Sequence, residues 1–157
     1  MRYDEFISQV QQRALLDTRE EAEQATRATL QTLGERLAGG ETKDLASQLP
    51  PEMAQSLLMG QEGTPGKFSL DEFFWLVSER EGVDPAQATD HARIVTALLS
   101  EVVTMGEIEN VRAQLPKDFA RLFEVENEGD LPDIDDLSDV DDLLDVDDLA
   151  DIDDLKT

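Results

Sequence analysis

The sequence has no cysteine, a single histidine and few basic residues, and each shortage excludes a class of function. Without cysteine there are no disulfides, thiolate metal ligands or cysteine nucleophiles. Only 13 Lys and Arg stand against 37 Asp and Glu, which gives a formal net charge of −24. Because phosphate groups are also negative, we expect no binding to nucleic acid and none to anionic membrane surfaces.

Long apolar runs are missing too. No segment approaches the roughly 18 consecutive apolar residues that span a bilayer, and the first residues lack the apolar stretch of a signal peptide. We therefore expect a cytoplasmic protein. His91, the only histidine, has no second His and no Cys as a partner for catalysis or metal binding, so we expect it to be partly buried in a helix. The sequence predicts no catalytic residue, cofactor site or metal site, and hence no enzyme.

The negative charge is concentrated at the C-terminal end of the chain. From Asp130 onward, 28 residues contain 13 Asp and one Lys. Residues 124–157 therefore form an acidic low-complexity tail, and Gly129 and Pro132 lie at the boundary. The body that precedes the tail is moderately acidic, and its charge density is ordinary for a soluble protein.

The body contains one pattern twice. Asp-Glu-Phe at 4–6 recurs at 71–73, and Gln-Leu-Pro at 48–50 recurs at 114–116. Sixteen identities over about 56 aligned pairs, with a single one-residue gap, indicate a tandem duplication. We predict three segments before the tail, namely a helical repeat unit at 1–58, a Gly/Pro linker at 59–67 and a second helical repeat unit at 68–123.

Each unit has the start signals of helices. Capping boxes occur at 18–21 and 69–72, and Asp84-Pro85 supplies an N-cap followed by a proline in the first helical position. Apolar residues at a spacing of three and four then mark a long helix at 22–37 and another at 88–103.

Glycine and proline supply the stop signals. We expect Gly39-Gly40 and Gly106 to end the long helices in a left-handed conformation, and Pro50 and Pro116 to end the helices that follow. No stretch alternates with the period of a strand. The predicted fold class is all-α, with two tandem homologous helical bundles of three to four helices each, followed by a disordered acidic tail.

Several phrases of the body carry a family resemblance. They are Tyr3-Asp4-Glu5-Phe6, residues 21–28, 33–37 and 39–41, Leu45-Ala46-Ser47-Gln48-Leu49-Pro50, Arg80-Glu81-Gly82-Val83 and Val111-Arg112-Ala113-Gln114-Leu115-Pro116. These phrases resemble the bacterial and archaeal DUF2267 proteins over residues 3–123. The resemblance implies a small all-helical domain and transfers no catalytic residue, and the tail lies outside it.

Two arginines recur at equivalent places in both units, as Arg13 and Arg80 and as Arg27 and Arg93. A functional interpretation is anion binding in each unit. We favour a structural one, in which each guanidinium pairs with a recurring acid, because duplicated units share what folds them more than what they bind. The candidate acids are Glu35 and Glu101, or Asp17 and Asp84.

An aromatic run at 73–77 distinguishes the second unit from the first. Trp75 and Leu76 replace Ser8 and Gln9, so they are expected to point away from the core face that both units share. We expect them to pack against the first unit or the linker. The alternative is an exposed patch that binds a partner or makes a dimer.

The tail repeats the phrase Ile/Val-Asp-Asp-Leu four times with a period of six residues. The copies are Ile134-Asp135-Asp136-Leu137, Val140-Asp141-Asp142-Leu143, Val146-Asp147-Asp148-Leu149 and Ile152-Asp153-Asp154-Leu155. An apolar residue at every third position drifts around an α-helix, so it builds no stable face, and the aspartates repel one another. We therefore expect this segment to be disordered in isolation.

Three functions fit the tail. The first is multivalent docking onto a protein partner that offers a basic or apolar groove. The second is solubilisation alone. The third is calcium binding by the paired aspartates, although the twelve-residue loop with its central glycine is missing, so only weak divalent-cation binding is expected. We favour docking, because solubility requires no regular phrase with large aliphatic residues.

Together these features predict a non-enzymatic interaction or adaptor protein. The competing hypothesis is a small-ligand binder or enzyme that uses the cleft between the two units. The sequence fixes neither the partner nor the oligomeric state.

Overall fold

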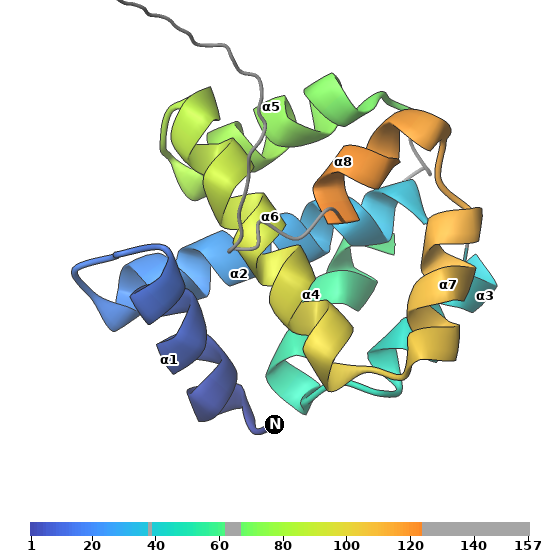
Figure 1. Ribbon diagram of the computed structural model, residues 1–157, viewed down its shortest axis with the longest axis horizontal. Coiled ribbons are helices and arrows are strands. Elements are labelled where there is room, and N and C mark those ends of the chain that lie inside the picture. Colours follow the sequence, from blue (N-terminus) through green and yellow to red (C-terminus); the bar gives the residue numbers. More distant parts are fainter. Residues whose placement is uncertain (38, 62–66, 124–157) are drawn as a thin grey trace, which may run out of the picture. The chain divides into compact units, whose positions relative to one another are not determined.

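The computed structural model describes residues 1–37, 39–61 and 67–123, which form eight α-helices and one 3₁₀ helix without any strand among them (Figure 1). In chain order the elements are α1 (Tyr3–Arg13), α2 (Arg19–Arg36), α3 (Gly39–Ala46), α4 (Pro51–Gln61), α5 (Leu70–Glu81), α6 (Pro85–Val102), α7 (Met105–Ala113), the 3₁₀ helix η1 (Lys117–Phe119) and α8 (Ala120–Phe123). The prediction of an all-α body is confirmed. We refer to α1–α4 as the first half and to α5–α8 as the second half.

The residues predicted to begin helices act as caps. The side-chain oxygen of Thr18 accepts a hydrogen bond from the backbone N–H of Glu21 at 3.1 Å, and that of Ser69 accepts one from Glu72 at 3.3 Å. Asp84 caps α6 in the same way at 2.9 Å. Each cap satisfies a backbone donor that the first turn of a helix leaves free.

The expected glycine stops are wrong. Gly40 and Gly106 lie inside α3 and α7, whereas α2 and α6 are followed by Leu37 and Val103 in extended backbone, with φ of −83° and −98°. Between α6 and α7, Val103 and Thr104 are both extended and turn the chain directly from one helix into the next.

Left-handed backbone occurs instead after the first helix of each half. Leu15 follows α1 with φ of 56°, and Gly82 follows α5 with φ of 80°. Glycine adopts this conformation freely, whereas a leucine there is strained.

Both halves contribute to one apolar core. The two 18-residue helices, α2 and α6, contact each other, α2 also packs on α5, and α1 packs on α6 (Figure 1). Phe6 and Leu33 of the first half and Phe73 and Leu99 of the second belong to the same continuous cluster of buried side chains. The described residues accordingly fall within one compact unit, Met1–Glu124.

Two glycines allow α2 and α4 to approach closely. A Cβ added at Gly34 would lie well inside contact distance of the backbone carbonyl oxygen of Leu57, and one added at Gly60 would meet that of Gln31 in the same way. Both contacts are to backbone atoms, which cannot rotate away as a side chain does. The close contact of α2 and α4 therefore depends on the absence of a side chain at both positions.

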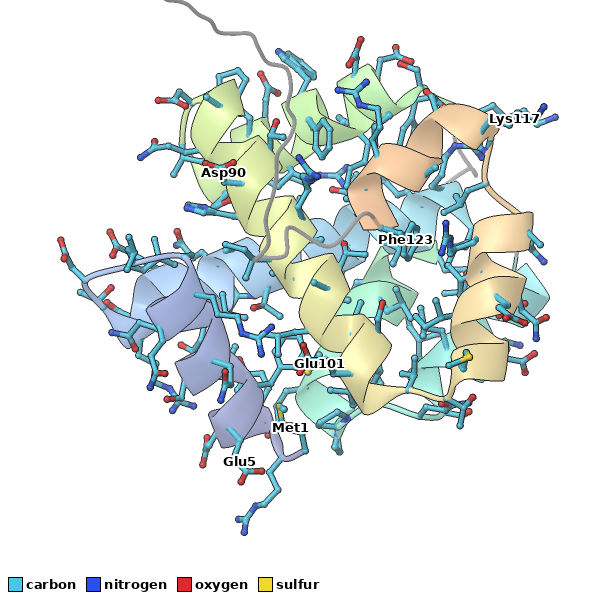
Figure 2. The ribbon with its side chains drawn as sticks, in the orientation of Figure 1. Met1, Glu5, Asp90, Glu101, Lys117 and Phe123 are labelled. Carbon is cyan, nitrogen blue, oxygen red and sulfur yellow. The ribbon has the colours of Figure 1, made fainter. Side chains whose placement is uncertain are left out.

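Two arginine–glutamate pairs cross between the halves. In α1, the guanidinium of Arg13 donates to both carboxylate oxygens of Glu101, at 3.0 and 3.3 Å. Glu101 belongs to α6 (Figure 2). In α5, Arg80 donates to Glu35 of α2 at 2.5 Å and to the hydroxyl of Thr32 at 2.9 Å. The predicted pairing with a recurring acid is confirmed for Arg13 and Arg80, and it stays a prediction for Arg27 and Arg93. Each of the two pairs joins one half to the other.

Some of the predicted boundaries differ from the helix ends. Helix α4 continues to Gln61, so residues 59–61 of the predicted linker are helical. The tandem repeat units at 1–58 and 68–123 remain a prediction. The acidic tail at 124–157, with all four Ile/Val-Asp-Asp-Leu phrases, lies outside the described residues.

Candidate functional site

The start of α7 is fixed against the end of α3 by side-chain hydrogen bonds. Thr104 caps α7 by accepting from the backbone N–H of Glu107 at 3.2 Å. The side-chain oxygen of Gln48, two residues after α3, accepts from the backbone N–H of Thr104 at 2.9 Å, and its amide donates to the Thr104 hydroxyl at 3.4 Å. This arrangement places Glu107, in the first turn of α7, against α3.

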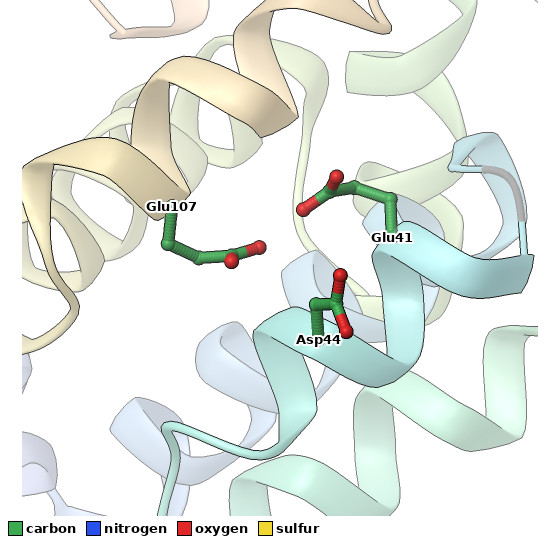
Figure 3. A group of neighbouring side chains, drawn as sticks. All are labelled: Glu41, Asp44 and Glu107. Carbon is green, nitrogen blue, oxygen red and sulfur yellow. The ribbon is translucent and has the colours of Figure 1, made fainter.

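Three carboxylates converge at this contact. Glu41 and Asp44 lie three residues apart in α3 and share a helix face, and Glu107 faces them from α7 (Figure 3). One oxygen from each of the three side chains lies within 4.8 Å of the other two. Glu41 and Glu107 are only 8% and 7% exposed, whereas Asp44 is open to solvent. The cluster therefore has a buried end and a solvent-facing end.

Each of the two buried glutamates has a carboxylate oxygen that lacks a hydrogen bond. The Oε2 atom of Glu41 and the Oε2 atom of Glu107 are buried and have no hydrogen-bond donor. Burial raises the pKa of Glu107 to about 7, and both a proton shared with Glu41 and the negative charges of Glu41 and Asp44 add to this rise. A buried carboxylate oxygen is costly without a proton, a donor or a cation.

Sequence reasoning missed this cluster, because it predicted no metal site and named none of the three residues as ligands. One signal was present, namely the recurrence of Gly40-Glu41 as Gly106-Glu107. That recurrence predicts similar surroundings for the two glutamates, but it does not predict that they face each other. Their meeting depends on how α3 packs on α7.

His91 forms a second buried pair, within the second half. It is 6% exposed, and its Nδ1 pairs with an oxygen of Glu81, which is 7% exposed. The hydrogen bond to Glu81 raises the pKa of His91, burial opposes that rise, and the nearby acids Asp90 and Glu21 add to it. His91 lies in a helix as predicted, but it is buried more fully than the partial burial that was expected. The pair connects α5 to α6.

Trp75 and Leu76 lie on the outer side of α5, as their polar counterparts predicted. Phe73 and Phe74 are buried, Leu76 is partly buried, and Trp75 is 52% exposed. The exposure matches that of the first half, where Ser8 is exposed and Gln9 partly buried. The expectation that Trp75 would be buried against the first unit or the linker is thus wrong, because its position faces solvent in both halves.

No helix of the described ranges is both long and apolar enough to span a membrane.

Residues 3–122 match the model of a family described as an uncharacterized conserved protein family, DUF2267. The chain belongs to the DUF2267 family. The match confirms the resemblance deduced from the repeated phrases, covers α1 to α7 with most of α8, and leaves out the acidic tail. A search of curated proteins gave no match.

Proposed function

We propose that this DUF2267 protein is a non-enzymatic interaction protein whose acidic tail docks onto a protein partner. The observation that carries the proposal is the fourfold Ile/Val-Asp-Asp-Leu phrase at 134–155. Each copy pairs aliphatic anchors with two carboxylates, which suits a groove that is basic at its edge and apolar inside. Several weak copies on one chain raise the effective concentration of the next copy once the first has bound. A cytoplasmic location is part of this proposal.

The exposed indole of Trp75 supports a role in binding. Tryptophan is enriched at the centres of protein interfaces, where its large area is covered by the partner. The first half has Ser8 at this position, so the fold itself does not require an aromatic side chain there. Trp75, with its neighbour Leu76, is thus a second candidate contact for the partner.

We also propose that the body is organised as two tandem repeats. Two observations support this proposal. The helices follow one another in the same order in both halves, and equivalent residues form reciprocal contacts. Arg13 and Arg80 occupy equivalent positions in the repeated pattern, and so do Glu35 and Glu101. Arg13 pairs with Glu101 and Arg80 pairs with Glu35, so the same kind of contact is made twice between the halves. Reciprocal contacts of this kind are typical of two equivalent units related by a twofold axis.

A set of full-length variants tests the docking proposal. Replacing Leu137, Leu143, Leu149 and Leu155 with serine keeps every charge and removes one apolar anchor from each phrase. We expect the proteins recovered with the intact chain at physiological salt to be lost with this variant, and to decline steeply as one, two and three copies are changed. If the variant recovers the same partners as the intact chain, the tail acts only through its charge and the docking proposal fails.

Adjacent leucines provide a matched control. Leu143 belongs to a phrase, whereas Leu144 follows it outside the repeat. Leu143→Ser and Leu144→Ser remove the same side chain from neighbouring positions, so a difference in partner recovery identifies the phrase as the recognised unit. Equal losses would point to general hydrophobicity of the tail instead.

A chain that ends at Gly129 is expected to keep the melting temperature of the body.

A small-ligand or ion-binding role between the halves is the second candidate, and one observation favours it. Glu41 and Glu107 come from different halves and meet with Asp44 at one point. Carboxylate oxygens are the ligands that hard cations prefer, so this arrangement supports an ion-binding role at the contact between the halves.

A further inference from the structure

We propose that Glu41, Asp44 and Glu107 form a binding site for a hydrated divalent cation between α3 and α7. Their oxygens lie close enough together for one ion to contact all three, since each pair lies within 4.8 Å. Cations of this kind hold oxygen ligands at about 2.0–2.6 Å, so two ligands of the same ion are separated by at most about twice that length. The site goes beyond the proposed docking function and does not depend on the tail.

The buried oxygens give the independent reason to expect a ligand. The Oε2 atoms of Glu41 and Glu107 are buried without any hydrogen-bond donor, on side chains that are more than nine-tenths buried. Both side chains point into the space that they share with Asp44 (Figure 3). A positive ion there would satisfy both oxygens at once, whereas a single shared proton bonds them only to each other.

The chemistry of the ligands selects a hard cation. All three donors are carboxylate oxygens, which suit Mg²⁺, Mn²⁺ and Ca²⁺. Zinc is disfavoured, because the chain has no cysteine and its one histidine is paired with Glu81. Asp44 is exposed, so water reaches the ion and completes its coordination from the solvent side.

A divalent cation requires ionised ligands, and the backbone around two of the three carboxylates favours their charged form. Both glutamates lie in the first turn of their helices, where the backbone dipole favours negative charge and helps to keep the ligands ionised.

Calorimetric titration of the full chain with Mn²⁺ alone tests the proposal. Three proteins are compared at pH 8, namely the intact chain, Glu107→Gln and Glu109→Gln. Glu109 is exposed on the same helix, so its variant removes the same charge without touching the cluster. All three keep the acidic tail, and weak binding by the tail is the same in each.

We expect one site per chain in the intact protein and in Glu109→Gln, and an affinity at least about tenfold lower in Glu107→Gln. The glutamine variant should fold, because it removes repulsion among acids, and its melting temperature in chelator checks this. Mn²⁺ is also paramagnetic, so it should broaden the amide signals of α3 and α7 in the intact protein. Equal affinity in all three proteins, or broadening that spares α3 and α7, would overturn the site and leave a proton-sharing pair of glutamates.

Discussion

The two halves of the body carry the same order of helices but secure the last helix of each in different ways. In the first half, α4 is eleven residues long and packs directly on α2 through Gly34 and Gly60. The second half ends in a 3₁₀ turn followed by the four-residue α8, where Phe119 is buried with its ring 5.7 Å from that of Phe73. The first half thus ends in a long helix in close backbone contact with α2, and the second half in a short segment with a buried aromatic contact.

The halves differ again in their polar contacts. Only the second half has the buried His91–Glu81 pair, because the position equivalent to His91 is Ala25. The turn after α1 holds a strained Leu15, whereas the turn after α5 holds Gly82. The core positions match between the halves, while turns and buried polar groups vary, which indicates that the shared pattern fixes the helices and leaves these details free.

The largest difference between the halves is expected at the position of Gly34. Gly34→Ala places a methyl group against the backbone of Leu57, so α4 must move away from α2. We expect a loss of about 3 kcal/mol or more in the free energy of unfolding. The second half has Ser100 at the equivalent position, and Ser100→Ala is the control. Denaturant melts in which both variants unfold like the intact protein would show that the glycine contact is unimportant.

The next largest effect is the pH dependence of the free energy of unfolding, which arises where Glu107 of the second half contacts Glu41 of the first. The pKa of Glu107 is about 7 in the folded protein and 4.5 in the ordinary state, so the folded state binds more protons within this range. Stability contributed by the protonated group is therefore present at pH 4.5 and is lost as the pH rises to 7. In chelator, the intact protein should lose on the order of 1–2 kcal/mol more than Glu107→Gln over this range.

The His91–Glu81 pair acts in the same direction at higher pH. The pKa of His91 is raised in the folded protein, so the stability from the charged pair is present below 6.5 and lost as the pH rises through the folded value. Glu107→Gln should therefore flatten the stability curve below pH 7 and leave the decline above it. Parallel curves for the two proteins from pH 4.5 to 7 would show that Glu107 is not protonated in the folded state.

Exchanging the turn residues of the two halves should have opposite effects of about 1 kcal/mol or less. Leu15→Gly relieves a left-handed leucine whose side chain is 88% exposed, so little burial is lost and stability should rise by about 0.5 kcal/mol. Gly82→Leu introduces the same strain, with open space around the new side chain, and should lower stability by about 1 kcal/mol. Changes of the same sign in thermal melts would contradict this account of the turns.

The smallest effect is expected at Trp75. Replacing it with serine, the residue of the first half, should change stability by less than about 1 kcal/mol, because half of the side chain is already in water. Phe73→Ala on the same helix is the buried control and should cost about 3–5 kcal/mol. A large loss of stability in Trp75→Ser would assign the indole to the core and remove the support that it gives to partner binding.

The sequence was sufficient for the helices, because caps and apolar spacing are local. Thr18, Ser69 and Asp84 cap the helices that their side chains predicted. Comparison of the repeated phrases also predicted that Trp75 and Leu76 face outward. The sequence did not predict the helix ends at the glycines correctly. Gly40 is compatible both with the end of one helix and with the first turn of the next, and only the path of the chain decides between these two places.

The candidate site was not predictable in the same way. Glu41 and Glu107 are 66 positions apart, and nothing local states that α3 packs on α7. The recurrence of Gly-Glu at 40–41 and 106–107 predicted only that the two glutamates have similar local surroundings. Whether two such residues meet depends on how the helices pack in the assembled body.

The central claim is that the two halves unfold as one body held by contacts between them. Hydrogen exchange of the full chain under native conditions, compared between the intact protein and Arg80→Ala, tests it most directly. Arg80 lies in the second half and bonds Glu35 and Thr32 of the first, so the variant should lower the opening free energy of Leu33 and Leu99 amides equally, by about 1–2 kcal/mol. Glu79→Ala, at an exposed position on the same helix, should change neither amide. A loss confined to Leu99, with Leu33 unchanged, would show that the halves open independently and would contradict the claim.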